Sequence, residues 1–221
     1  MSDLRALIAG WEQGWAASRD LPAAEHAGGG LRVDSRQLGR DTEYFALDDD
    51  PAVLSGLASR VLAEPGATWL TVPTTDPDRA AAALTSAGLV LLRTSEQMMT
   101  IDLRTHPRPA VPPTYRLVLE SADARVSVAV FGSGDAWAAR GHAGLAGRIA
   151  VADRILTGPD HRRRGLAAAV MGELAAAAVE RGADQGILVA SEEGQRVYGM
   201  LGWTPAAQVL IAARPGTQYP D

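Results

Sequence analysis

The chain has 221 residues, 47% of them hydrophobic, which is enough for a full core in one large domain or two small ones. A net charge of −5 argues against a general nucleic-acid-binding protein, and the absence of cysteine excludes disulfides, cysteine metal sites and an acyl-cysteine intermediate. No apolar run has the length of a membrane span and the N-terminus does not resemble a signal peptide, so the sequence predicts a cytoplasmic protein without a membrane partner.

The first half of the chain predicts helices and strands in alternation. Apolar residues three and four apart between Leu4 and Trp15 form one stripe of an N-terminal helix, which Leu21-Pro22 ends. The other segments that predict helices are 51–63, after an aspartate-proline turn, and 79–87, closed by a glycine. The segments that predict strands are a pair within 31–47, then 67–72, 89–92 and 97–103.

The second half follows a proline-dense segment at 107–113, which predicts a semi-rigid connector. Beyond it the expected strands are 115–120, 125–131, 136–145, 148–157, 186–190 and 207–213. The expected helices are 165–181 and 192–201.

A short basic turn between a predicted strand and a predicted helix is the strongest candidate for a ligand site. The turn His161–Arg164 follows the strand at 148–157, and Gly165 opens an alanine-rich helix. Free backbone N–H groups and the positive end of the helix dipole converge at such a position. Gly165 has no Cβ atom, which lets a phosphate approach the backbone closely. The sequence therefore predicts a phosphorylated cofactor held between residues 157 and 167.

Two segments of the second half resemble those of a known family. Arg162-x-x-Gly165-x-Ala167 resembles the R/Q-x-x-G-x-G/A pyrophosphate loop of the GCN5-related N-acetyltransferases (GNAT). The later segment at 191–203, Ser-Glu-Glu-Gly-Gln-Arg-Val-Tyr-Gly-Met-Leu-Gly-Trp, resembles the N-x-x-A-x-x-L-Y-x-x-L-G-F segment of the same family. The two segments occur in the family's order, and the resemblance covers roughly residues 115–210.

The resemblance implies an α/β (α+β) GNAT fold, in which a mixed, mostly antiparallel central sheet is splayed between its strands four and five and flanked by helices. Residues 114–214 would form the catalytic domain that binds acyl-CoA, followed by a tail at 215–221. Residues 1–106 resemble a degenerate GNAT-like half that lacks the pyrophosphate loop, as in tandem members of the family, although any small α/β segment gives a similar pattern.

The function that the resemblance implies is that of an acyl-CoA-dependent N-acyltransferase. The expected cofactor is acetyl-CoA or another acyl-CoA, and the expected acceptor is the amine of a small molecule. The absence of cysteine fits direct attack without a covalent enzyme intermediate. Two alternatives stay open: an enzyme that takes its acyl group from an acyl carrier protein, and a non-catalytic acyl-CoA-binding module.

The resemblance also assigns roles within the site. The loop would hold the pyrophosphate, a strand edge would pair with the peptide-like pantetheine arm, and a backbone N–H near Leu156 would stabilise the thioester oxygen. Tyr198 would protonate the leaving thiolate as the general acid. The implied cofactor-binding residues are Ile155, Leu156 and Thr157 on the strand edge, Arg162, Arg163, Arg164, Gly165, Leu166 and Ala167 in the loop, and Tyr198.

The general base and the acceptor wall depart from the family's pattern. Val151 stands where histone-type members carry a glutamate, and Asp153 is the candidate base because it lies two residues on, on the same strand face. Asp153 could instead pair with Arg148 or Arg154, and Glu96, Glu192 and Glu193 are weaker candidates. Only residues 121–124 separate the first two strands of the second half, where the family has helices. The wall of the site that binds the acceptor must then come from the first half or from a second subunit of a homodimer.

Overall fold

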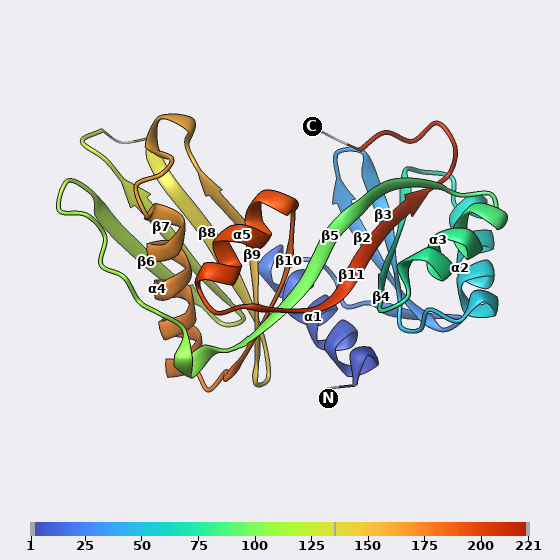
Figure 1. Cartoon of the computed structure of the whole chain (residues 1–221), viewed down its shortest axis with the longest axis horizontal. Helices are drawn as coiled ribbons and strands as arrows, with labels where there is room; N and C mark the ends of the chain where they lie inside the picture. The colour runs from blue at the N-terminus through green and yellow to red at the C-terminus, as the bar shows by residue number, and fades with distance from the viewer. Residues whose placement is uncertain (1–2, 135, 220–221) are drawn as a thin grey trace.

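The computed structural model describes residues 3–134 and 136–219, and strands and helices follow one another along both ranges (Figure 1). The strands are β1 (Glu25–Ala27), β2 (Gly30–Gln37), β3 (Arg40–Ala46), β4 (Thr68–Thr74), β5 (Val90–Asp102), β6 (Arg116–Ala122), β7 (Arg125–Phe131), β8 (Trp137–Ala146), β9 (Ile149–Thr157), β10 (Gln185–Ala190) and β11 (Thr204–Ala213). The helices are α1 (Leu4–Ser18), α2 (Pro51–Ala63), α3 (Pro77–Ser86), α4 (Leu166–Glu180) and α5 (Glu192–Met200), with 3-10 turns η1 (Leu103–Thr105) and η2 (Pro159–His161).

All the described strands belong to one sheet, in the order β1-β2-β3-β4-β11-β5-β10-β9-β8-β7-β6. The neighbours β3–β4 and β9–β10 are parallel and the other pairs are antiparallel, so the predicted mixed, mostly antiparallel sheet is confirmed. The long strands β5 and β11 cross from one half of the molecule to the other (Figure 1). Because β11 pairs with both β4 and β5, the two halves share one sheet.

Local patterns predicted most of these elements, and α2 begins and ends at the predicted residues. The separate strands expected at 89–92 and 97–103 are wrong, since β5 is one strand from Val90 to Asp102. β11 pairs along β5 from Val90 to Thr100, and β10 pairs along its second part. The polar stretch Arg93–Glu96 lies before the part of β5 that pairs with β10, so β11 alone keeps it extended, and register shifts against β11 absorb its irregularities.

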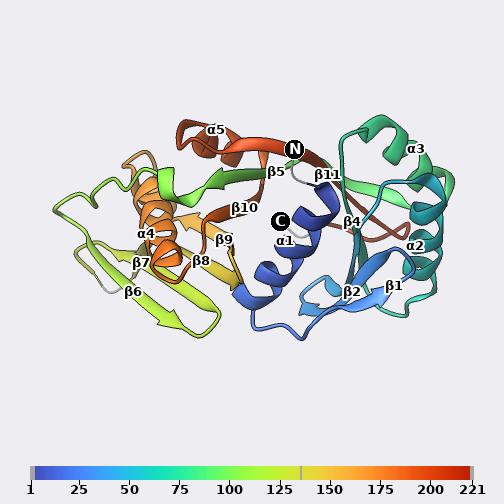
Figure 2. The same cartoon turned by 90° about the horizontal axis from the view of Figure 1, so that it is seen from below.

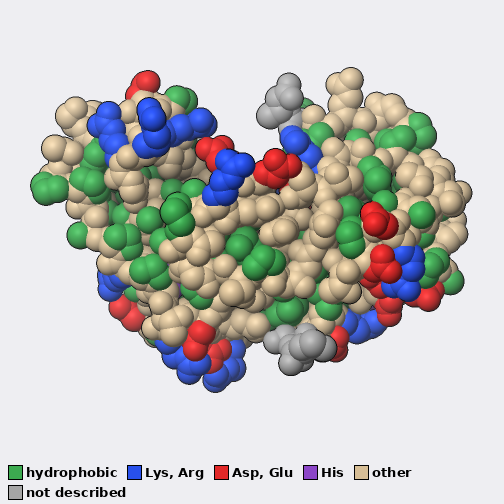
Figure 3. All heavy atoms as spheres, viewed as in Figure 1, with side chains coloured by type: hydrophobic (Ala, Val, Ile, Leu, Met, Phe, Trp, Pro, Cys, Tyr) green, Lys and Arg blue, Asp and Glu red, His purple; other side chains and the backbone are tan. Residues whose placement is uncertain are grey.

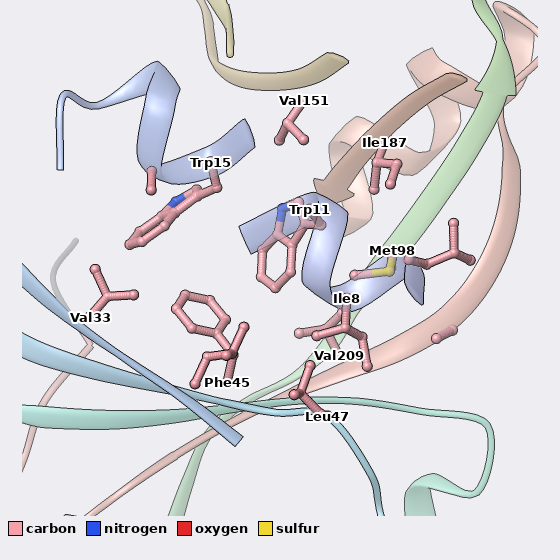
Figure 4. Packing of buried hydrophobic residues seen from close by; sticks show 14 of the residues in the cluster. Ile8, Trp11, Trp15, Val33, Phe45, Leu47, Met98, Val151, Ile187 and Val209 are labelled. Atoms are coloured by element: carbon pink, nitrogen blue, oxygen red, sulfur yellow. The ribbon is translucent and has the colours of Figure 1, made fainter. Parts of the chain in front are cut away.

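Helix α1 lies between the two halves (Figure 2) and packs closely on β8 and β9. A Cβ atom on Gly144 would lie 1.8 Å from the backbone oxygen of Gly14, so the helix and the strand approach backbone to backbone. On the opposite side of α1, Trp11 and Trp15 meet the ring of Phe45 edge-on, with centroids 5.3 and 5.2 Å apart (Figure 4). α1 therefore joins the second half to the sheet of the first.

The remaining helices cover the other face of the sheet. α2 and α3 pack on the first-half strands, and α4 and α5 pack on the second-half strands. β6 and β7 form a hairpin, and no helix separates them in the described chain. Within the described residues no helix combines the length and apolarity needed to cross a membrane.

Candidate active site

Both halves of the chain line one cavity of about 1170 Å³, in the hollow that the space-filling view shows between them (Figure 3). The second half contributes β9, the loop before α4, the end of β10 and α5. The first half contributes residues of α1, β3, β4 and β5, while β11 and Tyr219 of the tail complete the lining. The first half thus forms one wall of this cavity.

The basic loop lies at one end of the cavity, at the N-terminus of α4. Arg162, Arg163, Leu166 and Ala167 line the cavity together with Gly165. Gly165 has φ of +75°, a left-handed conformation that glycine adopts without steric cost. A Cβ atom there would meet no atom within 4 Å, so backbone conformation, more than space, favours glycine. The first turn of α4 leaves N–H groups without helical acceptors, and a phosphate is a suitable acceptor for them.

The arginines of the loop differ in their contacts, which the sequence could not separate. Arg164 donates from Nη1 to the Tyr115 hydroxyl at 3.0 Å, and that hydroxyl also lies 3.0 Å from Nδ1 of His161. Arg162 and Arg163 line the cavity instead, and Arg163 has a φ of +59°. The loop thus directs two guanidinium groups along the cavity and fastens the third to Tyr115.

Strands β9 and β10 separate beside this loop. Their parallel pairing runs only from Ile149↔Gln185 to Val151↔Ile187, which agrees with the expected splay between strands four and five. The predicted edge residues Ile155, Leu156 and Thr157 lie beyond that point and line the cavity. Backbone groups on this edge are therefore free to bind an extended, peptide-like ligand.

A β-bulge shapes the same edge. Between the pairs Arg140↔Leu156 and His142↔Asp153, one residue of β8 faces two residues of β9. Arg154 takes up the irregularity with a φ of +52°. Such a bulge bends the strand and turns backbone groups away from the ladder, which exposes them to the cavity.

Tyr198 lies on α5 and lines the cavity from the α4–α5 face of the sheet. Ser191 caps this helix by accepting a hydrogen bond from the Gly194 N–H at 3.4 Å, although the family often has asparagine there. Burial, with a smaller contribution from the Asp153 carboxylate, raises the pKa of Tyr198 to about 12. The phenol is thus a neutral proton donor at physiological pH.

Asp153 also lines the cavity, but a cation already binds its carboxylate. Arg19 donates to both carboxylate oxygens, at 2.7 and 2.8 Å, and the Ser18 hydroxyl donates at 3.0 Å. Burial would raise the pKa of Asp153, but these hydrogen bonds and the charge of Arg19 lower it below its ordinary value. The role of Asp153 as base stays a prediction, and its contacts favour anchoring the end of α1 to β9.

The first half contributes carboxylates that sequence reasoning did not single out. Glu43 is buried, accepts a hydrogen bond from the Thr71 hydroxyl at 2.6 Å and pairs with Arg40 at 2.8 Å. Glu12 is only 3% exposed, and its Oε1 has no hydrogen-bond partner among the described residues. Burial, followed by the charge of Glu43, raises the pKa of Glu12 to about 7. In the sequence, the one indication that Glu12 is buried was its position next to the apolar stripe of the first helix.

Comparisons with known proteins agree with this geometry. Residues 97–203 match the model of the acetyltransferase (GNAT) family. A GCN5-related N-acetyltransferase from Kribbella flavida is similar in structure, with a TM-score of 0.73 at 18% identity, over 98% of this chain and 97% of that one. A GNAT-family acetyltransferase structure from Novosphingobium aromaticivorans has a TM-score of 0.61 at 18% identity, over 94% and 98%.

A tandem GNAT protein from the clavulanic acid biosynthesis pathway, without acetyl-CoA, has a TM-score of 0.55 at 13% identity, over 83% of this chain and 77% of that one. At such identities these likenesses concern the fold. No curated protein sequence matched the chain at a significant level.

Proposed function

Because residues 97–203 match the model of the acetyltransferase (GNAT) family, we propose that this chain transfers an acyl group from acetyl-CoA to the amine of a small molecule. The observation that carries the proposal is the continuity of the cavity. It runs from the loop of Arg162 and Gly165, along the free edge of β9 and past Tyr198, to the wall that the first half forms. A donor and an acceptor can therefore meet in one continuous space.

The residues along the cavity fit the parts of acetyl-CoA. Arg162, Arg163 and the N–H groups at the start of α4 would bind the diphosphate, and the left-handed Gly165 keeps that backbone open. The edge from Ile155 to Thr157 would pair with the amides of the pantetheine arm. Bound there, acetyl-CoA would supply an acyl group activated as a thioester.

The protein's own part in the reaction is to orient and to move protons. A backbone N–H of the bulged segment near Leu156 would donate to the thioester oxygen as negative charge develops on it. The Tyr198 hydroxyl would donate its proton to the departing sulfur, a role that suits a phenol whose pKa of about 12 keeps it protonated. Burial of the Tyr198 hydroxyl strengthens its interaction with the sulfur, because little water competes for it.

The acceptor wall supports a small molecule over a protein substrate. Trp11, Trp15 and Thr71 reach the cavity from the first half, and Tyr219 of the tail stacks on Trp69 with ring centroids 4.9 Å apart. These side chains are mostly buried and come from elements on different sides of the space. They converge on the acceptor side of the cavity, which suits a small molecule, whereas a long groove would suit a peptide.

Calorimetric titration with acetyl-CoA, followed by a screen of small amines read by thiol release, tests this proposal. We expect micromolar binding and thiol release that depends on an amine. A folded protein that binds no acetyl-CoA would contradict the proposal, and titration with an acyl carrier protein would then test the other donor.

A further inference from the structure

Glu96 lies where the two halves of the sheet meet. Its strand, β5, pairs with β11 through Glu96↔Val209 on one edge and with the last residue of β10 through Gln97↔Ala190 on the other. Glu96 points to the same face of the sheet as Met98, which belongs to the core under α1, and it lines the cavity. The carboxylate thus lies just beyond the end of β10, beside the gap between β9 and β10.

Glu96 differs from the neighbouring carboxylates in having no cation bound to it. Among the described residues, no arginine or histidine lies within ion-pair distance of it, whereas Asp153 is bound by Arg19 and Glu43 by Arg40. Within the described parts of the chain, its side chain accepts one hydrogen bond, a long one of 3.4 Å from the Tyr219 hydroxyl. Glu193 also lines the cavity, but it is exposed to solvent in the first turn of α5. Glu96 is thus the half-buried cavity carboxylate that is free to accept a ligand.

The electrostatic surroundings of Glu96 suit a proton acceptor. Burial raises the pKa of its carboxyl, and the Arg93 guanidinium opposes part of this effect. The charge of Glu43 adds to the increase, while Arg40 and the hydrogen bond from Tyr219 reduce it. A carboxylate of raised pKa binds a proton more readily than a free one, which is what removing a proton from an amine of pKa near 10 requires.

Residues from both faces of the sheet line the cavity beside Glu96. Tyr198 packs on the α4–α5 face with Met99 and Leu188, while Glu96 and Met98 lie on the α1 face. Both Tyr198 and Glu96 line the same cavity, and β9 and β10 are not paired with each other beyond Val151 and Ile187. An amine that enters from the α1 face therefore passes Glu96 on its way to a thioester held beside Tyr198.

We infer that Glu96, supplied by the first half of the chain, binds the ammonium group of the acceptor and removes its proton; the inference rests on the proposed function. Glu96 takes one N–H proton, which frees the nitrogen lone pair to attack the thioester carbon. As the C–N bond forms and the C–S bond breaks, Tyr198 gives its proton to sulfur. The second proton lost by nitrogen restores Tyr198 through solvent, and Glu96 releases its own proton to water.

The test compares Glu96→Gln with wild-type protein and with Glu192→Gln, a matched change at an exposed position of α5 outside the cavity lining. Each variant is mixed with acetyl-CoA and one of four amines, namely ethylamine, tyramine, 1,4-diaminobutane or lysine. The rate of thiol release is then measured between pH 7 and pH 10. We expect Glu96→Gln to lower kcat/KM about 100-fold at pH 7, within the range of general-base effects, and to leave the Kd for acetyl-CoA unchanged. Glu96→Asp should restore part of the loss, and Glu192→Gln should behave as wild type.

The pH dependence separates proton removal from a structural role. An amine of pKa about 10 is about half deprotonated at pH 10 but only about 0.1% deprotonated at pH 7, so it depends much less on a base at pH 10, and the loss in Glu96→Gln should shrink toward that pH. A loss that is equal at pH 7 and pH 10, or no loss at all, would overturn the inference and leave the proposed function standing. Wild-type protein that binds acetyl-CoA but acetylates none of the four amines would also overturn it, whereas failure to bind acetyl-CoA would reject the proposed function itself.

Discussion

Replacing Glu12 with glutamine should remove a pH-dependent destabilisation from helix α1. Glu12 is 3% exposed, and the pKa of its carboxyl is raised from 4.5 to about 7, first by burial and then by Glu43. At about 1.36 kcal/mol per pKa unit, ionising it in the folded protein costs about 3 kcal/mol. Because the folded state holds the proton more tightly than the unfolded state, stability falls as pH rises from about 4.5 to about 7 and is constant above that.

Urea unfolding at pH 5 and pH 8, monitored by tryptophan fluorescence, measures how the free energy of unfolding changes with pH. We expect Glu12→Gln to gain up to about 3 kcal/mol over wild type between these two pH values. A pH-independent offset from placing an amide in the core cancels in that difference. Glu25→Gln, on the exposed strand β1, is the control and should follow wild type. Parallel pH dependences for Glu12→Gln and wild type would refute the reasoning.

Three further changes test the site. Gly165→Glu should weaken acetyl-CoA binding at least about tenfold by calorimetry, because a carboxylate enters the anion site; Gly182→Glu, with a similar left-handed backbone at the other end of α4, is the control, and equal effects would count against the loop. Tyr198→Phe should lower kcat about 100-fold with an unchanged Kd for acetyl-CoA, and an unchanged kcat would assign the proton to another donor. Asp153→Asn should cost about 2 kcal/mol at pH 7 in urea unfolding, because Arg19 loses a carboxylate partner in a partly buried pair. Since the pKa of Asp153 is lowered in the folded protein, this difference should begin to diminish as pH falls below about 4, and a difference that is the same at pH 3 as at pH 7 would argue against the ion pair.

Features that depend on adjacent residues could be predicted from the sequence. The aspartate and proline before α2 set its first residue, and Asp50 caps the helix by accepting a hydrogen bond from Ala52. The loop from Arg162 to Ala167 is similarly local, because it combines a left-handed glycine with the helix that directly follows it.

Features that depend on strand order could not be predicted. Arg19 and Asp153 are 134 residues apart in the chain, and no sequence pattern near either residue predicts that they pair. Glu96 reaches the cavity because β11 returns from the end of the chain to lie between β4 and β5. The single strand β5 has the same cause, since its polar middle remains extended through pairing with β11, a strand from the end of the chain.

The most direct test of the account is calorimetric titration of the wild-type chain with acetyl-CoA and, in parallel, with its 3′-dephospho form. Because the loop from Arg162 to Ala167 would bind the diphosphate that both compounds share, we predict micromolar binding of acetyl-CoA and retained, weaker binding of the 3′-dephospho form. Absence of binding for both compounds, in protein that circular dichroism shows to be folded, would contradict the central claim that this cavity holds an acyl-CoA.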